Sequence, residues 1–235
     1  MFYECSSLKS LDISNFNTEK VTNMCAFFYH CSLLSSLNLS NIKTNKVTNM
    51  SWMLSCNTFE YINLSSFNTI NVTDMSKMFK GCINLKFLNL SNFNTENVKD
   101  MNSMFEECVS LKDINLTNFN TKNVEDVSFM FNSCKSLLSL DISHFNTINI
   151  NKMNSMFENC SSLIKLNLSN FNIINISNMN SMFKNCSSLK KLNIPNYVDY
   201  INEIEYIFEG INPECEIICK NEKYLLSYLE SNFLA

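Results

Sequence analysis

Residues 85–108 read LKFLNLSNFNTENVKDMNSMFEEC, and most of the chain consists of copies of this phrase. In its first half, leucines alternate with polar residues over 88–90, which is the two-residue period of a half-buried strand. In its second half, apolar residues recur at spacings of three, four and seven, which favours one face of a helix or of short helical turns. Thr95 or Asn97 is expected to cap that segment. The apolar residues are Val98, Met101, Met104, Phe105 and Cys108.

The cysteine of the phrase returns at an almost constant interval. The interval is 26 residues throughout, except that Cys31 and Cys56 are 25 apart. A unit this short cannot bury its apolar face alone, so its copies must stack. The sequence therefore predicts an α/β, leucine-rich-repeat-like solenoid, with one parallel strand plus one short helical segment per ~26-residue coil and eight strand-bearing coils. The cysteines are Cys5, Cys31, Cys56, Cys82, Cys108, Cys134, Cys160 and Cys186.

Stacking turns each position of the repeat into a column of like residues. The strand half begins at Leu8, Leu34, Phe59, Leu85, Leu111, Leu137, Leu163 and Leu189. One inward column is expected to form a continuous aromatic spine, from Phe16 through Ile42, Phe67, Phe93, Phe119, Phe145 and Phe171 to Tyr197.

The repeat also predicts the domain boundaries. Residues 1–7 are an incomplete leading repeat, 8–211 the solenoid, and 212–235 a C-terminal cap made of a strand in CEIICK and a helix starting at Asn221. Because Met1 and Phe2 fall on the MF of the repeat, the chain is expected to start within one.

Composition excludes several classes of function. Hydrophobic residues make up 46% of the chain, enough for a sizeable core. With Gly 2 and Pro 2, few tight, glycine-dependent turns and no phosphate-cradling loop are expected. The net charge of −4 is scattered, so no nucleic-acid partner is expected. The sequence shows no membrane span and no signal peptide.

Regular cysteines raise the question of metal, disulfide or catalytic chemistry. A zinc site needs ligands paired at short spacing, which nearly all of these cysteines lack, and parallel side chains in a column suit a disulfide poorly. Reduced, buried thiols acting as small hydrophobes are the favoured interpretation. Cys215 and Cys219 are assigned to packing of the cap, and Cys25 is taken as incidental.

Nothing in the sequence marks a catalytic centre. His30 and His144 occupy variable positions with no evident partner or pocket. The chain is therefore expected not to be an enzyme, with no catalytic, cofactor-binding or metal-binding residue.

The outward strand positions form two columns. In the uniform column every copy has Asn or Asp, and in the variable column the residue differs from copy to copy. The uniform one, from Asp12 to Asn193, is expected to form a hydrogen-bonding Asn ladder. The variable one contains Tyr61 and Phe87 side by side, and exposed aromatics favour interfaces. The predicted partner-binding residues are Tyr61, Phe87 and Asp113.

The unit L-x-x-L-[DN]-[LI]-S-N-F-N-T-x-x-V-x-x-M-x-x-M-F-x-x-C resembles the BspA-like leucine-rich repeat family over residues 1–211. The resemblance implies a surface or secreted solenoid that binds proteins, such as host or extracellular matrix proteins, and acts in adhesion. The alternative is an intracellular structural scaffold repeat protein without a host partner. The sequence does not give the oligomeric state.

Overall fold

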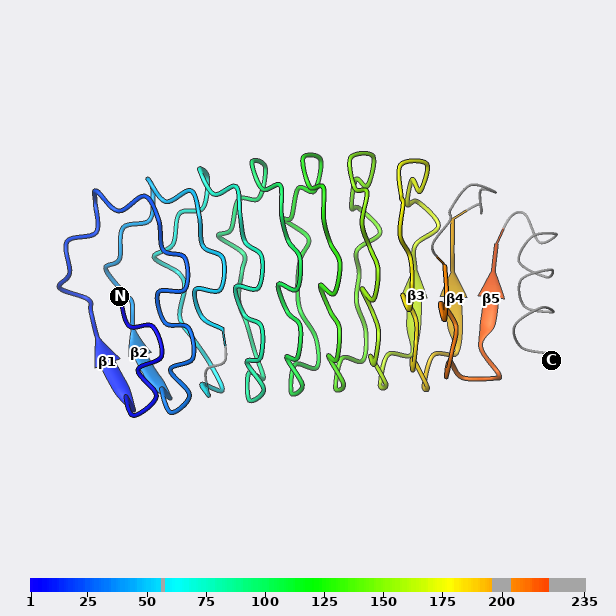
Figure 1. Cartoon of the computed structure of the whole chain (residues 1–235), viewed down its shortest axis with the longest axis horizontal. Helices are drawn as coiled ribbons and strands as arrows, with labels where there is room; N and C mark the ends of the chain where they lie inside the picture. The colour runs from blue at the N-terminus through cyan, green and yellow to red at the C-terminus, as the bar shows by residue number, and fades with distance from the viewer. Residues whose placement is uncertain (56–57, 196–203, 220–235) are drawn as a thin grey trace.

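The computed structural model shows a solenoid whose successive coils lie side by side along the long axis of the molecule (Figure 1). It describes residues 1–55, 58–195 and 204–219. Five strands are present in these ranges: β1 (Ser10–Asp12), β2 (Ser36–Asn38), β3 (Lys165–Asn167), β4 (Lys191–Asn193) and β5 (Glu216–Ile218). The predicted leucine-rich-repeat-like solenoid is therefore confirmed, with differences in its secondary structure.

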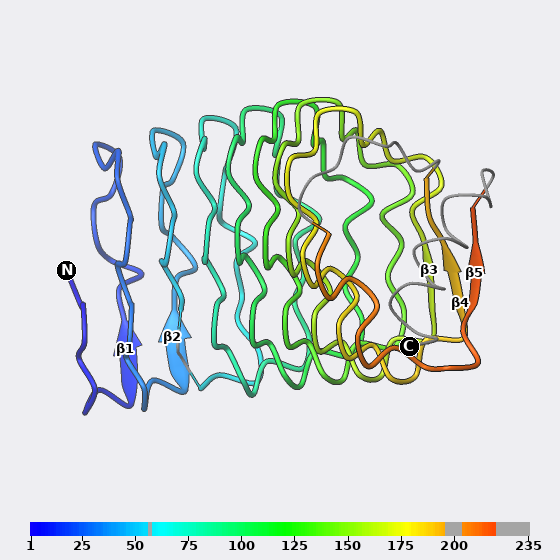
Figure 2. The same cartoon turned by 45° about the vertical axis from the view of Figure 1, so that its right-hand side comes forward.

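The strands pair in parallel with the offset that the repeat demands. β1 pairs with β2 through Ser10 and Ser36, and β3 pairs with β4 through Lys165 and Lys191. Between these two short sheets, seen at the two ends of the molecule in Figure 2, the chain makes single bridges such as Tyr61 to Phe87. Regular strand is thus shorter than the repeat predicts, although the register is the predicted one.

The second half of each copy is not helical, and the predicted helical segment is wrong. The structure contains no helix within 1–55, 58–195 and 204–219. Alternate N–H groups donate to the next coil at 2.8–3.0 Å, and those between them close turns to the third residue back at 3.1–3.2 Å. In one coil the first set is Met101, Ser103, Phe105 and Glu107, and the second is Met104, Glu106 and Cys108.

The spacing between coils explains why a helix is excluded. Strands joined by hydrogen bonds lie about 4.8 Å apart, whereas a helix with its side chains is about 10 Å wide. A second row of parallel bridges runs along the turn side, for example from Asp74 to Asp100 and from Asp100 to Asp126. Because neighbouring coils are hydrogen-bonded on both sides, neither side has room for a helix.

The turns place residues other than glycine in the left-handed region. Ser103 has φ 56° and Glu107 has φ 61°, and the same two positions are left-handed in neighbouring coils. Gly81 occupies the Glu107 position one coil earlier, with φ 72°. As expected from the scarcity of glycine, few of these turns depend on it; Ser, Asn, Glu and even aromatic residues adopt the conformation instead.

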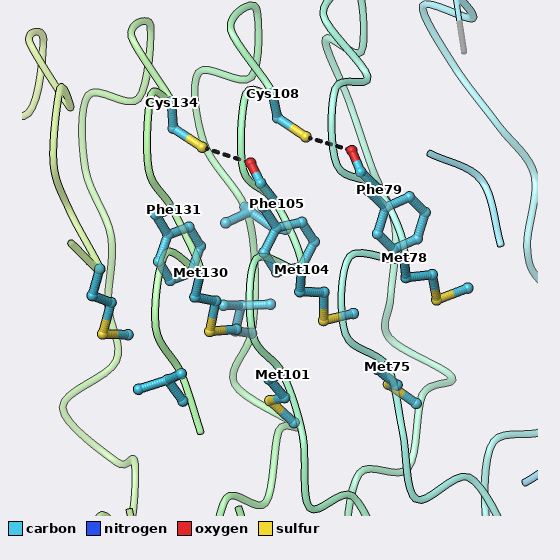
Figure 3. Close-up of a cluster of buried hydrophobic side chains, with 14 of the residues drawn as sticks. Met75, Met78, Phe79, Met101, Met104, Phe105, Cys108, Met130, Phe131 and Cys134 are labelled. Atoms are coloured by element: carbon cyan, nitrogen blue, oxygen red, sulfur yellow. Dashed lines mark hydrogen bonds between the residues drawn. The ribbon is translucent and has the colours of Figure 1, made fainter. Parts of the chain in front are cut away.

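The apolar residues of the turn half are buried as the spacing predicts, although the backbone differs. Val98, Met101, Met104, Phe105 and Cys108 are each 0% exposed. The longest ring stack runs through this half, with centroids 5.5–6.0 Å apart (Figure 3). Its rings are Phe79, Phe105, Phe131, Phe157, Phe183 and Phe208.

The predicted aromatic spine lies in a different column and is only partly present. Phe67 and Phe93 stack at 6.4 Å, and the column is buried from Ile42 to Phe171. Phe16 is 40% exposed at the N-terminal coil, and Tyr197 lies outside the described residues.

A column of threonines joins the coils through their side chains. Thr95 Oγ1 donates to Asn120 O at 3.0 Å and accepts from Asn120 N–H at 2.8 Å. Asn97 Nδ2 donates to Ile70 O at 2.7 Å. Both residues therefore bind neighbouring coils, and the prediction that one of them caps a helix is wrong. The other threonines that donate to the following coil are Thr18, Thr44, Thr69, Thr121 and Thr147.

The uniform outward column does not form the predicted Asn ladder. Instead, the side chains from Asp12 to Asn167 accept from the N–H two residues further along their own coil, as Asn89 Oδ1 does from Ser91 N–H at 3.0 Å. The same contact is made by Asp12, Asn38, Asn63, Asn115, Asp141 and Asn167. These residues are turn formers.

At the C-terminal end, β5 pairs in parallel with β4 through Lys191 and Glu216. This is the strand expected in CEIICK. The helix expected from Asn221 lies outside the described residues.

Candidate functional site

The strand side presents its variable residues to solvent. In β3 the central Leu166 is buried, while Lys165 and Asn167 project outward. The exposed column through Lys165 also contains Tyr61 and Phe87. Because the residues beneath vary little from copy to copy, the coils differ mainly in this outer layer.

The structure brings Tyr61 and Phe87 together as predicted. They are bridge partners, their rings stack with centroids 6.4 Å apart at 18°, and they are 57% and 56% exposed. Two large aromatic rings this exposed form an apolar area in an otherwise polar column, and such rings are enriched at the centres of protein interfaces.

Charged residues border the aromatic pair. Lys86 Nζ lies 2.9 Å from Glu60 Oε2, beside the two rings, and both side chains are largely exposed. Asp113 is exposed at the same repeat position as Phe87, one copy further on, but no bridge joins the two among the described residues. The structure therefore pairs two of the three predicted residues, and the third follows in the next coil at the same repeat position.

Sequence reasoning missed a second aromatic cluster, on the turn side. Tyr3 stacks on Tyr29 at 5.1 Å, and Tyr29 meets the edge of Trp52 at 5.2 Å. Lys77 Nζ lies 4.8 Å from the centroid of the Trp52 ring. The sequence feature that could have revealed this cluster is the presence of aromatic residues at repeat positions that are polar in most other copies.

The thiols of the cysteine column are structural. Cys108 Sγ donates to Phe79 O at 3.3 Å and Cys134 Sγ to Phe105 O at 3.1 Å, and the same contact recurs in other coils (Figure 3). Both are free and 0% exposed. The predicted burial of these side chains is confirmed for the described cysteines from Cys31 to Cys186, whereas Cys5 is half-buried. Cys56 lies outside the described residues.

Burial also suppresses the reactivity of these thiols. Removal from water raises the pKa of Cys134 and of Cys186 to about 12, and raises the pKa of Cys108 and of Cys160 well above the ordinary value. Since the thiolate is the nucleophile, a thiol this hard to ionise is a poor candidate for chemistry. Cys25 is exposed, and Cys219 Sγ is buried against Pro195 O at 3.4 Å.

The two histidines, the other residues considered for catalysis, are held by local contacts. His144 Nε2 lies 3.0 Å from Leu116 O, and the His30 ring packs against Tyr29. Within the described ranges, no three His, Cys, Asp or Glu side chains are grouped to hold a metal ion. The described residues also include no helix long and apolar enough to cross a membrane.

One row of carboxylates crosses the turn side. Asp74, Asp100 and Asp126 are successive bridge partners, and Asp126 Oδ2 lies 3.4 Å from Lys152 Nζ. Burial, with a smaller contribution from the other two carboxylates, raises the pKa of Asp100. The three side chains form a line along the stack and do not converge on a point.

The stacked parallel coils and the conserved inward leucines define a leucine-rich repeat solenoid. A family described as "Mycoplasma protein of unknown function, DUF285" matches residues 1–114, 53–139 and 110–216, and the chain belongs to that family. No protein with a curated description matches the sequence.

One solved structure supports the fold, and two others are similar at lower TM-scores. A leucine-rich repeat protein from Bacteroides ovatus superposes with a TM-score of 0.57 at 17% identity, covering 94% of this chain and 56% of that one. One from Eubacterium ventriosum gives 0.47 at 16% identity, with 87% and 59% covered. A leucine-rich cell surface protein from Faecalibacterium prausnitzii gives 0.43 at 14% identity, with 96% and 63% covered. The chain thus spans less than two thirds of the length of each.

Proposed function

We propose that the chain is a non-catalytic repeat module that binds other proteins through the outer face of its strand side. The exposed Tyr61–Phe87 pair is the observation that carries the proposal, with Asp113 as an adjoining polar contact. A rigid, hydrogen-bonded stack holds these side chains in place before binding, which reduces the entropy lost on association.

The proposed setting is a cell surface or the secreted fraction, with adhesion to a host or extracellular matrix protein as the role. The BspA-like resemblance of the repeat supports this setting. No nucleic-acid partner is proposed, since the net charge is −4 and no basic stripe follows the strand side.

Binding to an immobilised panel of extracellular matrix proteins tests the proposal. Replacing both aromatics, Tyr61→Ser and Phe87→Ser, should weaken the binding of a retained matrix protein by about tenfold or more, since interface aromatics commonly contribute at least ~2 kcal/mol. Ile148→Ser with Ile174→Ser is the matched control, because these exposed apolar residues lie in another column. Equal loss in both variants, or none in the first, contradicts the proposal.

A structural scaffold inside the cell is the second candidate. The buried free thiols favour it, since reduced cysteines are typical of reducing compartments. Labelling intact cells with a membrane-impermeant amine reagent distinguishes the two, because only a surface protein is modified before lysis.

A further inference from the structure

One turn former of the outward column has lost its partner. In the preceding coils the Asn or Asp oxygen accepts from the N–H two residues later, as Asn167 Oδ1 does from Ser169 N–H at 3.1 Å. In the coil of β4, the residue two positions after Asn193 is Pro195, which has no N–H. Asn193 Oδ1 is buried, and because this N–H is missing, the oxygen has no hydrogen-bond partner. A buried acceptor without a donor is rare and requires an explanation.

This oxygen belongs to a residue that lines a hollow on the strand side. The hollow has a volume of about 410 Å³ and spans the outer face of β3 and β4. Its floor is apolar, through Leu140 and Leu166, and its polar lining includes Lys165, Lys191 and Asn193. A volume above roughly 300 Å³ is sufficient for a small ligand or a few residues of a peptide.

Two ammonium groups flank the same hollow on neighbouring coils. Lys165 and Lys191 are direct partners in the parallel sheet. Lys191 Nζ lies 3.3 Å from Glu216 Oε2, while Lys165 has no ion pair in the part of the chain that the structure describes. A lysine ammonium has three donors, so both retain capacity for another anion.

The acidic residue of the lining, Asp141, offsets only part of this charge. Asp141 accepts from Ser143 N–H at 3.1 Å and from Ser143 Oγ at 2.7 Å. These hydrogen bonds hold the pKa of Asp141 below its usual value, and both are accepted by its Oδ1. Lys190, adjacent to Lys191, is also exposed and adds a positive charge nearby.

We propose that this hollow binds an acidic residue of a protein partner, with the carboxylate between Lys165 and Lys191, and that the Asn193 side chain rotates on binding so that its Oδ1, buried in the free protein, accepts a backbone N–H of the ligand. An acidic residue in an extended segment carries both groups. The assignment of a protein ligand rests on the proposed function, because the same face carries the Tyr61–Phe87 pair.

Fluorescence anisotropy with a fluorescein-labelled Gly-Asp-Asp-Gly amide peptide tests the site at low ionic strength. The wild-type protein should bind this peptide saturably and should not bind the Gly-Asn-Asn-Gly counterpart. Lys165→Gln should weaken binding by about tenfold or more, as expected for a lost hydrogen bond to a charged group. Lys112→Gln, an exposed lysine elsewhere on the face, is the matched control and should have no effect.

Pro195→Ser tests the role of Asn193 Oδ1 as an acceptor and leaves Lys165 and Lys191 unchanged. It restores the residue that Ser169 provides one coil earlier, so the protein should fold, and its N–H should occupy Asn193 Oδ1. Peptide affinity should fall about threefold or more.

Absence of saturable binding, equal binding of the Asn peptide, or unchanged affinity in Lys165→Gln would overturn the inference. So would displacement of the peptide by a glucuronic-acid disaccharide at lower concentration than by unlabelled peptide, since that result identifies a saccharide site. The Tyr61→Ser, Phe87→Ser protein should still bind the peptide, so failure here is separable from failure of the proposed function.

Discussion

Glu107 shows how single residues meet the demands of the coil. Its φ of 61° places it in the left-handed region, as do His30, Ser133, Asn159 and Asn185 at the same repeat position. That conformation costs an L-residue with a side chain roughly 1–2 kcal/mol. Gly81 and Gly210 occupy two further copies of the position, so glycine is compatible with the local packing.

We therefore expect Glu107→Gly to leave the free energy of unfolding unchanged or to raise it by up to about 1 kcal/mol, because relief of strain offsets the greater entropy of the unfolded chain. Gly81→Val should lower it by more than about 1 kcal/mol, since a β-branched residue is strained there. Urea denaturation measures both. Lys122→Gly, at an exposed residue without positive φ, should only destabilise.

The cysteine column predicts a dependence of stability on alkaline pH. The pKa of Cys134 in the folded protein is about 12, above the ordinary value of 9.0. Protonated thiol is favoured in the folded state, so this contribution is complete below pH 9 and is lost as pH rises from about 9 to 12. In native protein at pH 8, iodoacetamide should modify Cys25 well before Cys108, Cys134 or Cys160. Equal rates by mass spectrometry would contradict this.

In the turn half, the repeat predicted which residues are buried but not the conformation of the backbone. Val98, Met101, Met104 and Phe105 face inward as they would from a helix, because spacings of three and four also fit a chain that turns every third residue. The distinction lies in hydrogen bonds between coils, which no single copy of the repeat reveals. Tyr61 and Phe87 were predictable as neighbours because a constant period fixes the register.

The unpaired acceptor at the hollow of β3 and β4 was not predicted, because it depends on one irregularity in a regular pattern. Pro195 replaces a serine or threonine, and the effect falls on Asn193, two residues earlier. Only the hydrogen-bond pattern of the other copies shows that Asn193 has lost a donor. In a repeat protein, departures from the pattern are therefore more informative than the pattern itself.

The threonine column gives a test of the contacts between adjacent turns. Thr95 is 1% exposed, and its hydroxyl both donates to and accepts from the Asn120 backbone. Thr95→Val keeps the shape but leaves an N–H and a carbonyl group unpaired, so it should cost about 1–3 kcal/mol. Thr117→Val, at an exposed threonine, should change the free energy of unfolding by less than about 0.5 kcal/mol. Equal effects would show that the buried contact contributes little.

Along the whole stack, each coil contacts only its neighbours, so stability depends on position. Phe105 lies between Phe79 and Phe131 in the ring stack and is 0% exposed. Phe105→Ala should therefore cost about 3–5 kcal/mol, measured by chemical denaturation. Hydrogen exchange should be fastest in the first coil, where Phe16 is 40% exposed, and slowest around Phe105. Uniform exchange along the chain would contradict a nearest-neighbour solenoid.

The near-identity of residues 153–163, MNSMFENCSSL, and 179–189, MNSMFKNCSSL, has a consequence for inheritance. Such sequences can misalign during recombination, so that one unit is duplicated or lost. Because each junction between coils is chemically the same, the product would still fold. Gene length can therefore vary in steps of one repeat. A duplication here adds one coil between the aromatic pair and Lys191, whereas a loss removes the coil that carries Lys165. Selection could tune the reach of this surface without inventing a new residue.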